Sequence, residues 1–596
     1  MLNYDVSIVG DTLQIADTGI APSNLTIFFN LDTGGYALVD PTKTFNESLP
    51  GVDGNGSTLL GINASFFASF PQVQRVLVSL NDGDDLVRVG STFLPSARPF
   101  IVDGGLGSDT IVGSPGDDAV SVEGLDNATV VGISFSNVEA FDGGEGSDSV
   151  VGTAGDDKFS LVSNNKGFGQ TGFIFENVES FLGNGGVDTV VATAVDDSVS
   201  INGIDNTSLL GIALIGVDVF DGGGGTDTVV GTVGNDTFTL TGNKAGIGTS
   251  GFGFANVEVF AGNGGIDTVI GTAGNDAFSL VSLGVATGLG MSFNDIAAID
   301  GGSSGIDTII GTAGDELVSI NGLNGASLLG ITYSDVEAFD GAGGTDTVDG
   351  TTGNDAFTLT GNEAGTGVGG FVFRDVEVFA GNGGTDTVIG TAGDDAFSLV
   401  SLGVATGLGM SFNDIAAIDG GSSGIDTVIG TAGDELVSIN GLNGASLLGI
   451  TYSSVEAFDG AGGIDTVDGT AGNDAFTLTG NEAGTGVGGF VFRDVEVFAG
   501  NGGIDTVIGT AGDELVSING LNGASLLGIT YSSVEAFDGA GGIDTVDGTA
   551  GNDAFTLTGN EAGTGVGGFV FRDVEVFAGN GGIDTVIGTA GDELVS

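Results

Sequence analysis

A repeat of 39 or 40 residues covers most of the chain, and it limits the possible folds more than any other feature. An aspartate followed by TV, TI or SV marks each copy, and thirteen such aspartates follow one another at spacings of 39 or 40 residues. They are Asp109, Asp148, Asp188, Asp227, Asp267, Asp307, Asp346, Asp386, Asp426, Asp465, Asp505, Asp544 and Asp584. Regular repeats of this length predict a stacked array in which each module contacts only its neighbours.

A longer period overlies the first one. Residues 262–380 and 381–499 differ at only six positions, and the next copy, which starts at Gly500, has lost one unit and runs 79 residues. A unit that can be lost whole is an interchangeable structural module, as in a solenoid.

The strand signals inside a unit are short runs of Val, Ile and Phe bounded by Gly, Asn and Asp. Nowhere do apolar residues recur at helical spacing over a useful window. We therefore expect an all-β protein, a right-handed parallel β-solenoid (β-helix or β-roll) built from ~40-residue repeats. Coils of about 20 residues are ordinary in such folds, so we expect two coils in each unit.

The first hundred residues have a different composition. Six of the seven prolines and four of the ten basic residues lie there, among strand-like runs such as LTIFFNL and VQRVLVSL. Because the open end of a solenoid exposes unpaired strand edges, a cap is needed. We interpret residues 1–100 as a β-rich N-terminal cap or small domain and residues 101–596 as thirteen repeats.

Charge excludes several classes of function. The chain has 79 acidic and 10 basic residues, a net charge of −69, and neither Cys nor His. This composition rules out thiolate zinc sites, Ser-His-Asp triads and the HExxH zinc helix. It also disfavours nucleic acid, which needs basic patches, and anionic membrane surfaces. At the same time 40% of the residues are hydrophobic, so the chain should fold once cations offset its charge.

Two glycine-rich turns in each unit have the composition of a calcium site. The first turn is the six residues that end at the marker aspartate, as in 104–109, and the second turn follows after three residues, as in 113–118. Glycine accepts positive φ and leaves backbone carbonyls uncovered, while calcium prefers carboxylate and carbonyl oxygens. We expect ligands at the thirteen first-turn aspartates and at eight in second turns: Asp118, Asp157, Asp236, Asp276, Asp355, Asp395, Asp474 and Asp553.

These turns resemble a known family. GGLGSDTIV at 104–112, GGEGSDSVV at 143–151 and GGGGTDTVV at 222–230 fit the nonapeptide G-G-x-G-x-D-x-U-x. The chain thus resembles the hemolysin-type (RTX) calcium-binding repeat proteins. The resemblance implies a parallel β-roll or β-helix, Ca²⁺ bound between neighbouring turns, and secretion guided by a C-terminal signal.

The chain departs from the family pattern in three ways. About 21 residues separate successive pairs of nonapeptides. Unit 183–200 has Val195 where a turn glycine belongs. Four second turns carry glutamate, at Glu316, Glu435, Glu514 and Glu593. We therefore give more weight to the first aspartate of each pair and expect fewer ions than turns.

We expect a non-catalytic, extracellular calcium-binding array that forms a rigid rod, with an adhesin, surface-layer or spacer role, and that folds on calcium binding after export. Calcium ions and components of a cell surface or extracellular matrix would be its partners, without nucleic acid and without membrane insertion. No N-terminal signal peptide is evident, and we expect further sequence beyond GTAGDELVS. Alternatives are the repeat region of a secreted enzyme, such as a carbohydrate-active β-helix protein, and an ice-binding-type solenoid.

Overall fold

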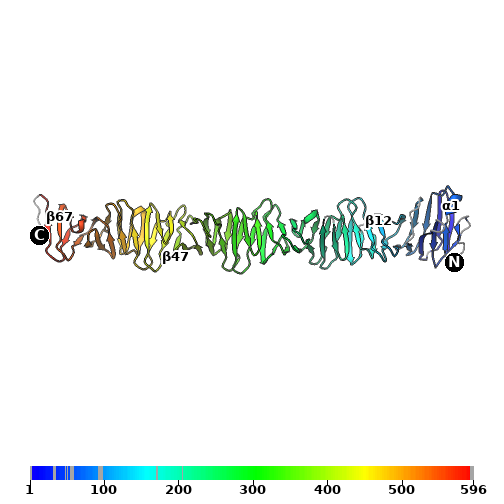
Figure 1. The fold of residues 1–596 in the computed structure, drawn as a ribbon, viewed down its shortest axis with the longest axis horizontal. Helices are drawn as coiled ribbons and strands as arrows, with labels where there is room; N and C mark the ends of the chain where they lie inside the picture. Colours follow the sequence, from blue (N-terminus) through cyan, green and yellow to red (C-terminus); the bar gives the residue numbers. More distant parts are fainter. Residues whose placement is uncertain are drawn as a thin grey trace. The chain divides into compact units, whose positions relative to one another are not determined.

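The computed structural model describes residues 3–590 except 20, 31–34, 47–48, 50–51, 54–58, 63, 91–97, 170–171 and 204–205. The described chain consists of short strands with one α-helix, α1 (Ala64–Ser69), and three 3-10 helices of three residues each (Figure 1). It divides into two compact units, Met1–Phe278 with Ser282–Gly305, and Ser279–Val281 with Ile306–Ser596. None of its described helices is long and apolar enough to cross a membrane. The expected all-β parallel solenoid is confirmed.

One repeat from the first compact unit illustrates the strand arrangement. Three of its strands form an antiparallel meander within one sheet, which we name sheet B. The other two pair in parallel in the opposite sheet, sheet A. The meander is β17 (Lys158–Ser163), β18 (Lys166–Gly169) and β19 (Ile174–Glu176), and the sheet A strands are β16 (Ser149–Val151) and β20 (Ser180–Leu182).

The next repeat uses the two sheets the other way round. Its meander lies in sheet A and pairs in parallel with β20. Its two flanking strands lie in sheet B, where the first pairs with β17. The meander is β22 (Ser198–Gly203), β23 (Asn206–Leu209) and β24 (Ile212–Ile215), and the flanking strands are β21 (Thr189–Val191) and β25 (Val219–Asp221). Each repeat crosses between the sheets three times, and this odd number exchanges the sheets from one repeat to the next.

The expected coil length of about 20 residues is wrong. Parallel partners lie 30 to 33 residues apart along sheet A, in the series Ala119, Ser149, Ser180 and Ala213. The difference has a simple cause. The two extra strands of each meander stay in one sheet, so they lengthen the path between partners without adding a crossing.

The second compact unit follows the same rule. Its labelled strand β47 (Ala396–Ser401) begins a meander with β48 (Val404–Gly407) and β49 (Met410–Asn413) (Figure 1). In the opposite sheet, β46 (Thr387–Ile389) pairs in parallel with β50 (Ala417–Asp419).

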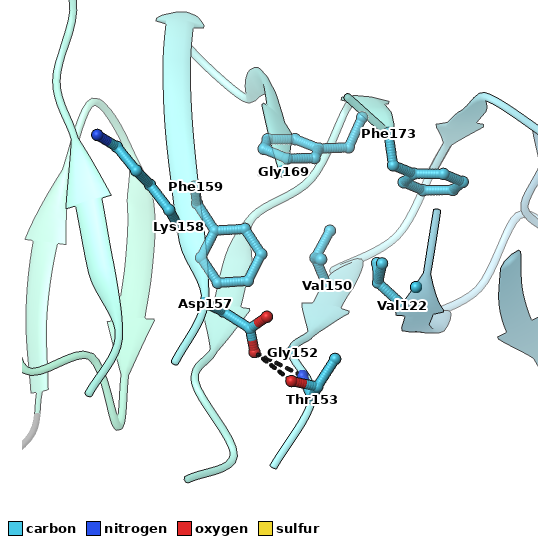
Figure 2. A pocket seen from close by; sticks show the side chains of 11 residues that line it. Val122, Val150, Gly152, Thr153, Asp157, Lys158, Phe159, Gly169 and Phe173 are labelled. Carbon is cyan, nitrogen blue, oxygen red and sulfur yellow. Dashed lines mark hydrogen bonds between the residues drawn. The ribbon is translucent and has the colours of Figure 1, made fainter. Parts of the chain in front are cut away.

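The core is a narrow apolar layer between the sheets. The central residue of most three-residue strands is buried, and the rings of Phe141, Phe175, Phe181 and Phe220 have no exposed surface. Burying one such side chain stabilises the fold by about 1.5–3 kcal/mol. Packing leaves a cavity of about 90 Å³ beside Phe159 and Phe173, seen in Figure 2.

The N-terminal strands continue both sheets of the first repeats. In sheet A, β8 (Arg75–Ser79) pairs with β10 (Phe100–Asp103). In sheet B, β3 (Asn24–Asn30) pairs with β9 (Leu86–Val89), which pairs with β11 (Thr110–Val112). These pairings extend both sheets on the N-terminal side of the first repeat, and the division at residue 100 stays a prediction.

Candidate metal centre

Three turns in each repeat connect the two sheets. The first and second turns are those expected from the sequence, and a third one, typified by residues 177–179, leads from β19 to β20. Along one edge they stack in the order second, first, third. The Asp118 N–H of a second turn donates to Asp148 Oδ1 of a first turn at 2.7 Å. The Asp148 N–H in turn donates to Glu179 Oε2 of a third turn at 2.9 Å.

Twelve of the thirteen first-turn aspartates are buried, and in most repeats one carboxylate oxygen has no hydrogen-bond partner. Oδ1 accepts a backbone N–H, which comes from a second turn except at Asp109, where Asp85 donates it, but Oδ2 is buried and unpaired in ten of these residues. They are Asp109, Asp148, Asp188, Asp227, Asp267, Asp346, Asp386, Asp465, Asp505 and Asp544. Burying a carboxylate oxygen without a hydrogen-bond partner costs free energy. A structure with the same unpaired oxygen in repeat after repeat therefore requires a partner for it.

Three first-turn aspartates differ from this group. Asp307 and Asp426 are also buried, but they lie in the longer turns GGSSGID and are not in the unpaired group. Asp584, in the last described repeat, is exposed, and its Oδ1 accepts the N–H of Asp553 at 2.9 Å.

A backbone oxygen of the third turn lies close to the unpaired carboxylate oxygen. A Cβ placed on Gly143, the first residue of its turn, would lie 2.5 Å from Asp148 Oδ2 and 2.2 Å from the Asn177 carbonyl oxygen. The equivalent Cβ on Gly460 would lie 2.4 Å from Asp465 Oδ2 and 2.0 Å from the Asp494 carbonyl oxygen. Only glycine fits here, and the oxygens that flank it are ligands of the kind that calcium prefers.

Burial disfavours the charged form of these aspartates. It raises the pKa of Asp148 to about 6, with further contributions from the charges of Asp118 and Glu179. It raises the pKa of Asp109, Asp346 and Asp465 to about 7. A divalent cation at Oδ2 would favour the charged form instead. The chemistry of this oxygen set therefore fits Ca²⁺.

Second-turn aspartates hold their own turns closed. Asp157 Oδ2 accepts hydrogen bonds from the Thr153 N–H at 2.6 Å and from Thr153 Oγ1 at 3.1 Å (Figure 2). The same carboxylate interaction with the residue four positions earlier occurs in Asp118, Asp236, Asp276, Asp355, Asp395, Asp474 and Asp553. Their assignment as calcium ligands stays a prediction, as does that of the first-turn aspartates, and in the second turns one carboxylate oxygen already has donors.

The second turns that depart from the family pattern keep the same hydrogen bonds. Glu316 Oε2 accepts the Thr312 N–H at 3.0 Å, and Glu435 and Glu514 do the same in their turns. Glu593 lies outside the described residues. In the degenerate unit, Asp197 Oδ2 accepts from both Thr193 N–H and Oγ1 at 2.7 Å, while Val195 is exposed. Asp197 is not among the ligands expected from the sequence, although it has the Thr-x-x-x-Asp spacing of most other second turns.

Third-turn carboxylates were also missed. Each accepts the N–H of a first-turn aspartate, and the available signal was a recurring N/D-V-E string before a strand, which seven of the ten share, with SVE at Glu456 and Glu535 and GVD at Asp218. The residues are Glu139, Glu179, Asp218, Glu258, Glu337, Glu377, Glu456, Glu496, Glu535 and Glu575. Nevertheless, within the described ranges no three acidic side chains group as a metal site. Any ion here would depend on backbone carbonyls.

Comparison with known proteins agrees with the turn chemistry. A family model, the RTX calcium-binding nonapeptide repeat, matches residues 101–124, 141–160, 212–238, 252–279, 301–318, 377–398, 459–478, 495–517, 538–557 and 574–595. No curated protein matches the chain. The matched segments contain both kinds of glycine–aspartate turn.

Proposed function

Because the chain carries RTX calcium-binding nonapeptide repeats between residues 101 and 595, and such repeats bind calcium ions, we propose that it is an extracellular array that folds on calcium binding. The observation that carries the proposal is the unpaired Oδ2 of ten first-turn aspartates, each buried in the same place of its repeat. Calcium at these oxygens would complete the turns and couple metal binding to folding.

The proposed mechanism is a change of state on export. At low calcium, the net charge of −69 and the buried carboxylates oppose stacking of the turns. At about 1 mM calcium, the range in which extracellular modules bind, the ions neutralise the columns of carboxylates and the repeats stack. The array would then act as a spacer or as a display surface for components of a cell surface or matrix.

A non-catalytic role agrees with the repetition itself. An active site needs one unique constellation of residues, whereas residues 262–380 and 381–499 differ at only six positions. The proposal therefore assigns the function to many equivalent calcium-binding turns and not to a single cleft.

Limited proteolysis combined with sedimentation tests this function. Metal-free protein is compared with protein in about 1 mM calcium, with magnesium at the same concentration as the control. We expect fast cleavage within residues 104–590 and slow sedimentation without calcium, and a protected, faster-sedimenting form with calcium only. Identical cleavage and sedimentation in all three conditions would refute the proposal.

A further inference from the structure

The turn residues that immediately precede successive parallel strands of sheet B stack in a column along the edge of that sheet. This column begins with a serine in place of an aspartate. Ser23, Asp85 and Asp109 precede the successive parallel strands β3, β9 and β11. The Ser23 N–H donates to Asp85 Oδ1, and the Asp85 N–H donates to Asp109 Oδ1 at 2.7 Å. Ser23 therefore occupies the carboxylate position in the turn that ends the column.

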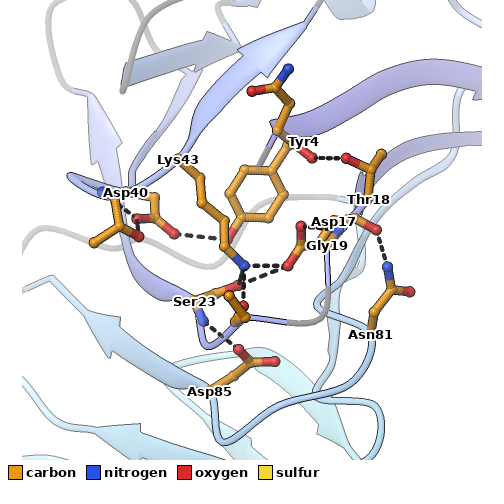
Figure 3. A network of polar contacts seen from close by, with 12 residues as sticks. Tyr4, Asp17, Thr18, Gly19, Ser23, Asp40, Lys43, Asn81 and Asp85 are labelled. Carbon is orange, nitrogen blue, oxygen red and sulfur yellow. Dashed lines mark hydrogen bonds and ion pairs between the residues drawn. The ribbon is translucent and has the colours of Figure 1, made fainter. Parts of the chain in front are cut away.

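A lysine ammonium group lies at this end turn, as Figure 3 shows. Lys43 Nζ donates to the Ala21 carbonyl oxygen at 2.6 Å, to Ser23 Oγ at 2.7 Å and to Asp17 Oδ2. Lys43 and Asp17 are 1% and 2% exposed. A carboxylate, a backbone carbonyl and a hydroxyl thus surround one positive charge, an oxygen set of the kind that binds a hard cation elsewhere.

The surroundings of the lysine close the site from solvent. Asp40, which is fully buried, accepts hydrogen bonds from Tyr4 Oη at 3.0 Å and from the Asn24 N–H at 3.1 Å. The Tyr4 ring centre lies 5.7 Å from the ammonium nitrogen. In the column itself, Oδ2 of Asp85 and Oδ2 of Asp109 have no hydrogen-bond partner, whereas Asp17 Oδ2, beside Ser23 at the end of the column, has the lysine ammonium as its partner.

We propose that the Lys43 ammonium is a built-in cation that takes the place of a calcium ion at the N-terminal end of this column. The N-terminal strands then fold without calcium and offer preformed strand edges on which the repeats stack once calcium is present. This inference rests on the proposed function for the role of calcium in the repeats. For the N-terminal region itself it needs only the contacts of Lys43.

Hydrogen exchange of the full chain, read by mass spectrometry, tests the inference. Metal-free wild type is compared with Lys43→Met, with Lys43→Arg, which keeps the charge, and with Lys158→Met, which removes an exposed lysine. Removing one partner of a buried pair is strongly destabilising, so Lys43→Met should speed exchange in β3, β8 and β9 about 100-fold. Lys43→Arg should restore much of this protection, and Lys158→Met should match wild type.

Two results would overturn the inference. In the first, calcium protects the repeats from exchange, but β3, β8 and β9 of the metal-free wild type exchange as fast as the metal-free repeats. The other is an unchanged N-terminal exchange rate in Lys43→Met. If the repeats are protected without calcium, the proposed function fails instead, and the effect of Lys43→Met on the N-terminal peptides still decides the role of the lysine.

Discussion

The first and second turns of a repeat have nearly the same sequence but place their aspartates differently. Asp148 ends the turn GGEGSD and has an unpaired Oδ2, whereas Asp157 ends GTAGDD and pairs Oδ2 with Thr153. The backbone at the second position explains the difference. Gly144 has a φ of +90°, but Thr153 is not among the positive-φ residues, and its N–H reaches the aspartate. One residue thus separates an aspartate with an unpaired buried oxygen from one that closes a turn.

Removing charge from each class of turn should have opposite effects on the metal-free protein. The first triple variant combines Asp465→Asn, Asp505→Asn and Asp544→Asn, all in first turns. The second triple variant combines Asp395→Asn, Asp474→Asn and Asp553→Asn, all in second turns. In the first triple variant each new amide can donate to the facing third-turn carbonyl. The metal-free form should gain stability, while the calcium needed for half-folding rises on the order of tenfold. Urea unfolding and metal analysis measure both.

The second triple variant serves as the matched control for the first. It should lose stability equally with and without calcium and bind as many ions as wild type, because these aspartates hold turns. Equal loss of bound calcium in the two triple variants would show that both classes of aspartate are ligands, and the contrast between the turns would be wrong.

The pH dependence of stability should change sign with calcium. Burial raises the folded-state pKa of Asp148, Asp227 and Asp544 to about 6 from an ordinary value of 3.8. The folded metal-free protein therefore binds more protons than the unfolded chain in this window. Its free energy of unfolding should fall as pH rises from about 4 to 7.

Calcium binding needs the deprotonated carboxylates, so the calcium-loaded protein should gain stability over the same pH range. Urea unfolding at several pH values, after metal removal on a chelating resin and again with calcium, checks both slopes. Parallel slopes in the two conditions would exclude these aspartates as the groups linked to calcium.

Loss of the threonine hydroxyl in second turns should have the smallest effect. Thr470 Oγ1 donates to Asp474 Oδ1 at 3.0 Å and accepts the Gly472 N–H at 3.0 Å. Thr391→Val, Thr470→Val and Thr549→Val together should lower the free energy of unfolding by about 1 kcal/mol per turn, with unchanged calcium affinity. The controls are Thr387→Val, Thr466→Val and Thr545→Val at strand starts, and a weaker calcium affinity in the turn variants alone would contradict the assignment.

The sequence was sufficient to predict the strands, the repeat period and the glycine–aspartate turns, because each depends on local residue chemistry. It was not sufficient to predict the exchange of sheets between repeats. The segment KFSLVSNNKGFG has strand and turn signals, but whether its strands stay in one sheet depends on pairing along the whole stack. The right-handed sense of the solenoid and the boundary at residue 100 stay predictions.

The missed residues share a physical reason. A glutamate such as Glu179 looks like a solvated strand-end residue until stacking brings it to the N–H of Asp148. Lys43 lies 20 to 26 residues from Asp17, Ala21 and Ser23 in sequence, and only the fold brings them together. Contacts between distant segments carry no local signal in one sequence.

Calcium titration followed by far-ultraviolet circular dichroism tests the central claim most directly. Metal-free protein is titrated with calcium, and a parallel sample with magnesium. We predict a cooperative gain of β structure with calcium only, because calcium takes six to eight oxygens in flexible geometry and magnesium does not. Full β structure before calcium is added, with no change on titration, would contradict the claim and leave the first-turn aspartates as turn formers like their neighbours.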